Sequence, residues 1–190
     1  MPTVYADRFP DQASQDDLTW KPLRLLTFYR VILAGLLTVL FFSISDSTTL
    51  GINNPALYAL TSTGYLGFSL LAGFTTRLRR PGYELQTVVQ LLVDIGAISL
   101  LIHASGGTSS GLGILLIITV AAGSILLPGR MAFLFAAIAS IAILGEQTYS
   151  AIILETSRPA GYTQAGLLGL ALFATAGIAD RKSTRLNSSP

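Results

Sequence analysis

The sequence predicts an all-α fold, a polytopic membrane protein built as a six-helix transmembrane bundle. Of its 190 residues, 51% are hydrophobic and only 12% are charged, and the mean hydropathy is +0.61. Soluble domains typically carry about 25% charged residues. The apolar residues gather in long runs, and the arginines and lysines gather at the ends of these runs. This combination is typical of a membrane protein rather than of a large soluble core.

Six segments are long and apolar enough to cross a bilayer, which takes about 20 residues in a helix. They are residues 23–45, 56–76, 85–104, 111–127, 131–154 and 163–179. The fourth and sixth are the shortest, so each is expected to tilt little or to be partly re-entrant. Strands are excluded because open sheet edges are not tolerated in lipid and the runs are too long for barrel strands.

The segments between the spans have the composition of turns. They are SDSTTLGINNP, RLRRPG, HASGGTSSG, PGR and ETSRPAG, all rich in Gly, Pro, Ser, Thr, Asn or Arg. The first 20 residues are polar and acidic, and we expect them to form a poorly ordered cytoplasmic leader. They lack the basic start and short apolar core of a signal peptide, so the first span is predicted to be an anchor.

The distribution of lysine and arginine predicts the orientation of the bundle. Eleven of the twelve basic residues fall before or at the entry to the first span, between spans two and three, between spans four and five, or after span six. Only Arg158 falls on the opposite side. Both termini are therefore expected in the cytoplasm, with the protein a multi-pass component of a bacterial inner membrane.

The last ten residues, RKSTRLNSSP, change composition abruptly, and KSTRLNSS resembles a translated sequencing-adaptor read-through. We therefore expect residues 181–190 to be a non-native or truncated tail, and a larger protein to have continued near Asp180. The alternative is a short basic tail that anchors the sixth span. The expected division is a leader at 1–20, a six-span sensor domain at 21–180, and this tail.

Span three carries polar residues that would be costly against hydrocarbon. Thr87, Gln90 and Asp94 share one face of the predicted helix, along its cytoplasmic half. This polar stripe is expected to face other helices. His103 lies nine residues beyond Asp94, about 180° around the helix and about 13 Å further along it. Asp94 and His103 therefore cannot form a dyad within one helix.

Comparison of depths predicts two pairings between helices. Glu146 in span five lies at nearly the depth of His103, and Arg30 in span one can reach the depth of Asp94. Asp94 is a candidate for packing or pairing, for sensing a partner, or for an ion pathway. His103 is expected to mark the outer interface without a catalytic role.

Small residues recur at helical spacing on spans five and six, where they allow helix backbones to approach closely. They are Ala132, Ala136 and Ser140 on span five, and Ala165, Gly169 and Ala176 on span six.

Several kinds of chemistry are excluded by residue content. One histidine and no cysteine exclude multi-histidine and thiolate zinc sites, and no Walker A or dinucleotide-binding motif occurs. GGTSSGLG, at 106–113, lacks a lysine and lies on the outer side, so a tight external turn is expected there. Asp94 and Glu146 lie at different depths, which argues against a paired-carboxylate hydrolase. We expect no enzyme activity, metal or cofactor in this chain, and its small net charge of +2 disfavours nucleic acid as a partner.

The stretch LLVDIGAISLLIHASGGTSSGLGILLIITVAAGSILLPGR, at 91–130, resembles the membrane domain of type IV pilus sensor histidine kinases. The opening LRLLTFYRVILAGLL, at 23–37, is also similar to that family. The resemblance implies the membrane-embedded input module of a two-component system that controls pilin gene expression. It implies PAS and kinase domains beyond this chain, and only the kinase domain would need ATP and Mg²⁺.

The resemblance also implies partners: the lipid bilayer, the major pilin subunit in the membrane, a response regulator reached through the kinase domain, and a second copy in a homodimer. Sensing of a pilin helix would use polar groups, for which Thr87, Gln90, Asp94 and Glu146 are candidates, with Arg30 and His103 as their pairing residues. The alternatives are a small six-span transporter or channel component, for which buried acids suit ion coupling, and a membrane scaffold.

Overall fold

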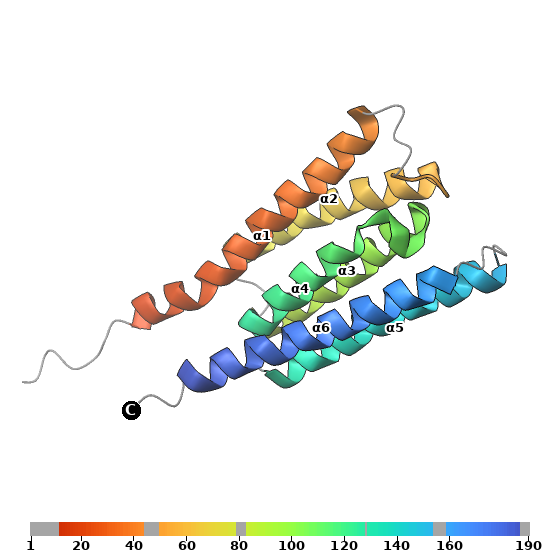
Figure 1. Ribbon diagram of the computed structural model, residues 1–190. Helices are drawn as coiled ribbons and strands as arrows, with labels where there is room; N and C mark the ends of the chain where they lie inside the picture. The colour runs from red at the N-terminus through yellow and green to blue at the C-terminus, as the bar shows by residue number, and fades with distance from the viewer. Residues whose placement is uncertain (1–11, 44–49, 79–82, 128, 154–158, 187–190) are drawn as a thin grey trace, which may run out of the picture.

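The structure, a computed structural model, describes residues 12–43, 50–78, 83–127, 129–153 and 159–186 (Figure 1). Every regular element in these ranges is a helix, as the composition predicts. The α-helices are α1 (Gln12–Ser43), α2 (Pro55–Leu78), α3 (Tyr83–Ala104), α4 (Gly113–Leu126), α5 (Gly129–Ile153) and α6 (Pro159–Leu186), and a short 3₁₀ helix, η1 (Gly107–Ser110), precedes α4. The all-α six-helix prediction is confirmed.

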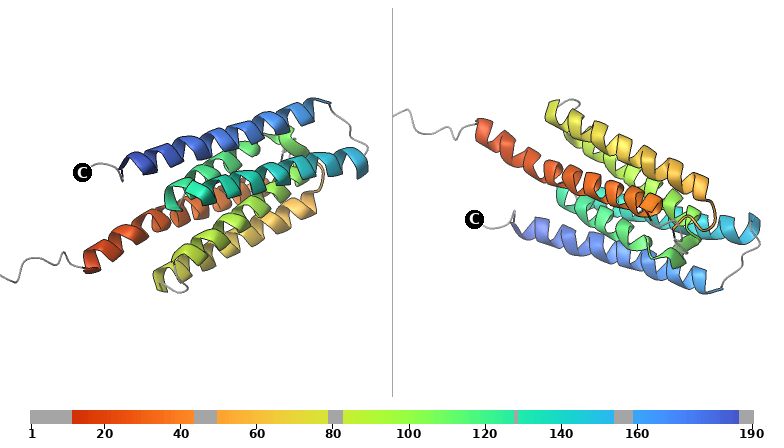
Figure 2. Two further views of the ribbon diagram at one scale, coloured as in Figure 1. Left: turned by 90° about the horizontal axis from the view of Figure 1, so that it is seen from below. Right: turned by 90° about the horizontal axis from the view of Figure 1, so that it is seen from above.

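The helices run antiparallel along the chain and pack as three hairpins, α1–α2, α3–α4 and α5–α6 (Figures 1 and 2). The α3–α4 hairpin lies in the middle, because α3 contacts α2, α4 and α5 while α4 contacts α3, α5 and α6. In the apolar segment of α3, 56% of the residues are buried, against 28% in those of α1 and α6. The beginning of α1 and the end of α6 lie at the same end of the bundle.

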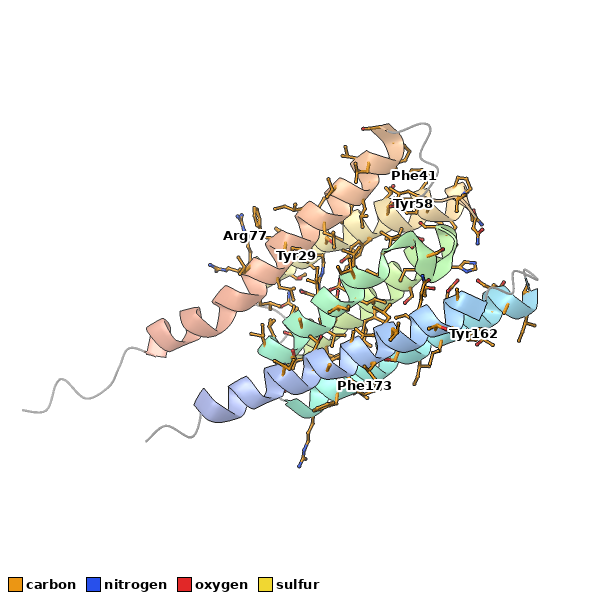
Figure 3. All side chains as sticks on the ribbon, viewed as in Figure 1. Tyr29, Phe41, Tyr58, Arg77, Tyr162 and Phe173 are labelled. Atoms are coloured by element: carbon orange, nitrogen blue, oxygen red, sulfur yellow. The ribbon has the colours of Figure 1, made fainter. Side chains whose placement is uncertain are left out.

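The outward faces of the helices are apolar, as expected for a lipid-facing surface. On α1, large hydrophobic side chains recur at helical spacing and are all exposed: Leu25, Phe28, Ile32, Leu36, Val39 and Phe42. The buried core is formed mainly by α3 to α6, and it includes Leu91, Ile98, Leu116, Phe135, Ile143 and Leu172. The side chains radiate from the ribbon on every helix (Figure 3).

Within the described ranges, four helical segments are long and apolar enough to span a membrane by length and composition alone: Leu23–Ser43, Glu84–Ala104, Arg130–Ile153 and Ala160–Ile178. Helix α2 is long enough, with 24 residues, but its Ser, Thr, Tyr and Gly residues lower its mean hydropathy. Helix α4 has only 14 residues, about 21 Å of helix against a hydrocarbon core of about 30 Å. The expectation of an unusually short fourth span is confirmed, whereas the sixth helix is 28 residues long.

Two helices extend beyond the spans expected from hydropathy. Helix α1 begins at Gln12, so residues 12–20 of the expected poorly ordered leader are helical. Helix α6 continues to Leu186, into the segment expected to be a separate tail. Adding residues to an existing helix costs far less than starting one, and polar residues such as Gln, Asp, Lys and Arg tolerate the helical conformation. Residues 1–11 and 187–190 lie outside the described ranges.

The outer connection between α3 and α4 is the tight turn that its glycines predict. Gly106, Gly107 and Gly111 have φ angles of 88°, 86° and 76°, a left-handed conformation that glycine adopts without strain. The turn includes η1, which packs against α3, α5 and α6. The connection between α1 and α2 satisfies a carbonyl at the end of α3. The backbone N–H groups of Asn53 and Asn54 donate to the Ala104 carbonyl at 2.9 and 3.2 Å.

The small-residue stripes of α5 and α6 are buried where these helices pack together, as predicted. Ala132 and Ala136 are fully buried, and so is Ala176 on the facing helix. A Cβ atom placed on Gly169 would lie 3.4 Å from Ser140 Oγ, so an alanine would just fit here and a larger side chain would not. Gly166, one turn earlier on α6, has open space around it.

The orientation can be tested by cysteine labelling, because the chain contains no native cysteine. Ser109 in the outer turn and Arg77 at the opposite end of the bundle are both exposed. We expect a membrane-impermeant maleimide to label Ser109→Cys in intact cells and to label Arg77→Cys only after the cells are opened. Labelling of Arg77→Cys alone in intact cells would reverse the orientation.

The α5–α6 contact can be tested with a matched pair of glycine substitutions. Gly169→Leu would force a large side chain against Ser140, and overpacking of this kind costs about 1–3 kcal/mol. Gly166→Leu faces open space and should leave stability unchanged or slightly raised, since glycine is a poor helix former. Unfolding of both variants in detergent measures the difference, and equal stabilities would contradict the predicted close contact.

Candidate functional site

A buried ion pair joins α1 to α3 in the interior of the bundle. Arg30 Nη2 donates to Asp94 Oδ2 at 2.5 Å, and Arg30 Nη1 donates to Gln90 Oε1 at 2.8 Å. The side chains of Arg30 and Asp94 are only 1% and 4% exposed. The predicted pairing of Arg30 with Asp94 is therefore confirmed.

Helix α2 supplies the remaining hydrogen-bond donor to Asp94. Tyr65 of α2 donates from its hydroxyl to Asp94 Oδ1 at 2.8 Å, so each carboxylate oxygen has a donor. A charge in hydrocarbon is costly unless it is paired, and here the guanidinium and carboxylate neutralise each other. The cluster thereby ties α1, α2 and α3 together at a single depth.

Tyr65 was not among the residues singled out from the sequence. A comparison of its depth in the bundle with that of Asp94 could have identified it. Tyr65 lies 12 residues before Arg77 and Asp94 lies 11 residues after Tyr83, so both lie about 17–18 Å from the same end of the bundle at about 1.5 Å per residue.

A second polar cluster lies near the outer end of the bundle. His103 Nδ1 and Glu146 Oε1 are 3.2 Å apart, which joins α3 to α5 as the depth comparison predicted. Ser150, one turn further along α5, donates to the same Oε1 atom at 2.8 Å. The Tyr149 ring meets the His103 ring edge to face, with centroids 5.4 Å apart. Ser150 and Tyr149 were also missed by the sequence reasoning.

The outer cluster does not have the arrangement of a nucleophilic active site. In a catalytic triad, the serine hydroxyl bonds to one ring nitrogen of the histidine and the carboxylate bonds to the other ring nitrogen. Here Ser150 bonds to Glu146 instead. Among the described residues, no group of three or more His, Cys, Asp or Glu side chains is placed to hold a metal ion. The cluster can hold α3 and α5 in register at the outer interface.

The polar stripe of α3 faces protein, as expected, but it is not presented to a partner. Thr87, Gln90 and Asp94 are 0%, 2% and 3% exposed. Arg30 engages both Gln90 and Asp94. The expectation that this stripe directly contacts a partner helix therefore does not fit the arrangement, because α1 and α2 already cover it. Glu146, whose side chain is 7% exposed, is equally unavailable.

A further polar contact on the same side was not anticipated. Gln86, near the start of α3, donates from Nε2 to the hydroxyls of Thr75 and Thr76 on α2, at 3.0 and 2.7 Å. Together with the Arg30 cluster, it makes the contact between the α1–α2 hairpin and α3 polar from the arginine-rich end to the middle of the bundle.

The ion pair can be tested by removing its two members separately and together. A carboxylate left alone can take up a proton, whereas a guanidinium cannot lose its charge. Asp94→Leu should therefore cost about 3–5 kcal/mol of unfolding free energy, and Arg30→Met should cost less. The double variant, Arg30→Met with Asp94→Leu, should lose less unfolding free energy than the sum of the two single losses. Unfolding in mixed micelles measures all three, with Tyr65→Phe as a control that loses one hydrogen bond, about 1 kcal/mol. Strict additivity would show that the pair does not interact energetically.

Comparison with known proteins agrees with the arrangement of the helices. The family model described as the PilS-like transmembrane domain matches residues 12–190. The sensor protein kinase PilS of Pseudomonas aeruginosa is 35% identical over 158 residues, which cover 81% of this chain and 28% of that protein. No solved structure matches the chain. The chain spans little more than a quarter of that relative, and it is a multi-pass membrane protein that belongs to the family of PilS-like transmembrane domains.

Proposed function

We propose that this chain is the membrane-embedded sensory input module of a two-component sensor histidine kinase that controls type IV pilus genes. The observation that carries the proposal is the match of the PilS-like family model to nearly the whole chain. The sensor kinase of P. aeruginosa, similar over the same region, supports it. The six-helix bundle is the element that would receive a signal from within the bilayer.

In the proposed orientation, both termini lie in the cytoplasm of a bacterium and the bundle spans its inner membrane. Exposed arginines support this orientation: Arg24 at the start of the apolar segment of α1, Arg77 in the last turn of α2 and Arg130 in the first turn of α5. Because successive helices run antiparallel, these positions fall toward the end of the bundle where α1 begins and α6 ends (Figure 1), and positively charged residues favour the cytoplasmic side.

The chemistry of the proposed receptor lies outside the region that matches. Autophosphorylation with ATP and Mg²⁺, transfer to a response regulator, and homodimerisation are assigned to the full-length kinase, of which the matched region covers 28% in P. aeruginosa. Helix α6 is the proposed output element. It runs without interruption from Pro159 to Leu186, and its small residues pack closely on α5.

The proposed ligand is a pilin subunit, a hydrophobic helix held in the same membrane. Because the polar stripe of α3 is covered by Arg30 and Tyr65, the ligand would contact the lipid-facing surface of the bundle. It would change signalling by favouring one arrangement of the helices over another, since a ligand shifts an equilibrium only through its different affinities for the two states. Thr87, Gln90, Asp94, Arg30, Glu146 and His103 would then set the energies of those arrangements.

A transporter or channel component is the less favoured alternative. Ion coupling needs acids that can exchange their partners with a transported ion. Asp94 is instead paired with Arg30 and Tyr65, and Glu146 with His103 and Ser150. The match to a kinase rather than to a transporter also favours the sensory function.

The proposal can be tested with a chimeric receptor. Residues 12–180 would replace the matching region of the P. aeruginosa kinase, and a reporter driven by the pilin promoter would measure its output. Allosteric couplings of about 1–3 kcal/mol correspond to about 5–150-fold changes, so we expect coexpressed pilin to change the output about fivefold or more.

Coexpression of an unrelated single-span protein is the control and should leave the output unchanged. The matched variants Gly169→Leu and Gly166→Leu, tested in the chimera at equal measured levels of folded protein in the membrane, show whether the output depends on the contact between α5 and α6. Output that is the same with and without pilin, in a chimera that reaches the membrane, would contradict the proposal.

A further inference from the structure

The contact between the α1–α2 hairpin and α3 contains hydrogen-bonding atoms that no described group satisfies. Arg30 Nε, Gln90 Nε2 and Gln86 Oε1 are all buried and all lack a partner. The three side chains are at most 5% exposed. Buried polar groups are normally satisfied by protein or by ordered water, so three of them within two helical turns require an explanation.

The identity of the two glutamine atoms follows from their neighbours. An arginine only donates hydrogen bonds, so the Gln90 atom that accepts from Arg30 Nη1 must be the oxygen, and the free atom is the Nε2 donor. The hydroxyls of Thr75 and Thr76 both donate to the Ala72 carbonyl. They can therefore only accept from Gln86, which leaves Gln86 Oε1 as a free acceptor.

The free atoms are thus two donors and one acceptor on adjoining positions. Gln86 and Gln90 are four residues apart on α3, which places their side chains one above the other, about 5–6 Å apart at Cβ. Arg30 already contacts Gln90 from α1. An anion would be repelled by the acceptor, and a cation would be repelled by the guanidinium. A water molecule can accept from Gln90 or Arg30 and donate to Gln86.

We propose that this polar seam, formed by Arg30, Gln86 and Gln90, is a binding site for internal water that bridges the three side chains. Buried waters typically make about three hydrogen bonds to groups of this kind. Gln86 lies in the first turn of α3, which begins at Tyr83 beside the arginine-rich end of the bundle. Water can therefore enter from that end and needs to reach only about 6 Å deeper to contact Gln90. The proposal does not depend on the sensory role.

The test is water-edited solid-state NMR of the isotopically labelled full chain in lipid bilayers. This experiment measures how fast magnetisation passes from water to each side chain. The side-chain amide of Asn53, exposed in the outer connection between α1 and α2, is the wet reference. Leu91 is the dry reference, because it is adjacent to Gln90 in sequence but is buried against Gly123 of α4. We expect transfer to Gln90 Nε2 and Arg30 Nε to approach the rate at Asn53, although both side chains are buried.

Substitutions assign the water to the seam. Gln86→Met removes the acceptor, so transfer to Gln90 and Arg30 should fall to the rate at Leu91. Gln86→Glu keeps an acceptor oxygen at the same position and should retain the fast transfer. Fast transfer in this variant would show that the loss in Gln86→Met comes from the missing acceptor and not from misfolding caused by any substitution at this position. Gln164→Met is the matched control and should leave the seam unchanged. Transfer in the unmodified chain no faster than at Leu91, or transfer indifferent to Gln86→Met, would overturn the proposal.

Discussion

A guanidinium in the apolar interior must have its charge balanced within the protein, and this requirement organises half of the bundle. Arg30 cannot lose its proton, so Asp94 has to lie within reach of it at the same depth. That condition sets the relative position of α1 and α3, and the bond from Tyr65 to the other carboxylate oxygen adds α2. Gln90 is tolerated because it bonds to Arg30, and Gln86 because it bonds to Thr75 and Thr76 of α2, so neither side chain meets lipid.

The bundle combines two modes of helix packing that differ in their physics. The α1–α2 hairpin meets α3 through directional hydrogen bonds, each worth little in a membrane because alternative partners are available to it. The helices from α3 to α6 meet through close packing of small and apolar residues, as where Leu91 packs on Gly123 and Ser140 lies against Gly169. Close packing has few alternative arrangements, whereas hydrogen bonds can be exchanged. The α1–α2 hairpin is therefore the part of the bundle best suited to change position while the Arg30–Asp94 pair stays intact.

Much of the architecture could be predicted from the sequence, because lipid restricts the chain to helices of a known length and because arginines mark their ends. Depth along each helix then predicted both polar pairs, Arg30 with Asp94 and Glu146 with His103. Depth and helical rotation do not specify which helices touch, so Tyr65, Ser150 and the contact of Gln86 with two threonines were missed. The start of α1 was placed too late and the end of α6 too early, because hydropathy marks the apolar part of a helix, not where the helix begins or stops. Direct contact of the polar stripe with a partner was left open as one alternative, because α1 and α2 could not be placed over it from the sequence.

Helix α3 is the one element that takes part in both modes of packing. Asp94 and Gln90 bind to α1, Leu91 packs on α4, and His103 at the outer end binds to α5. A displacement of the α1–α2 hairpin would act on α3 through the contact of α2 with α3 and through the bond of Arg30 to Asp94, while α1 also contacts α4 directly. The His103–Glu146 bond fixes the outer end of α3 to α5, so motion imposed at Asp94 would tilt α3 about that end. Such a tilt is largest at the arginine-rich end, where α6 leaves the bundle.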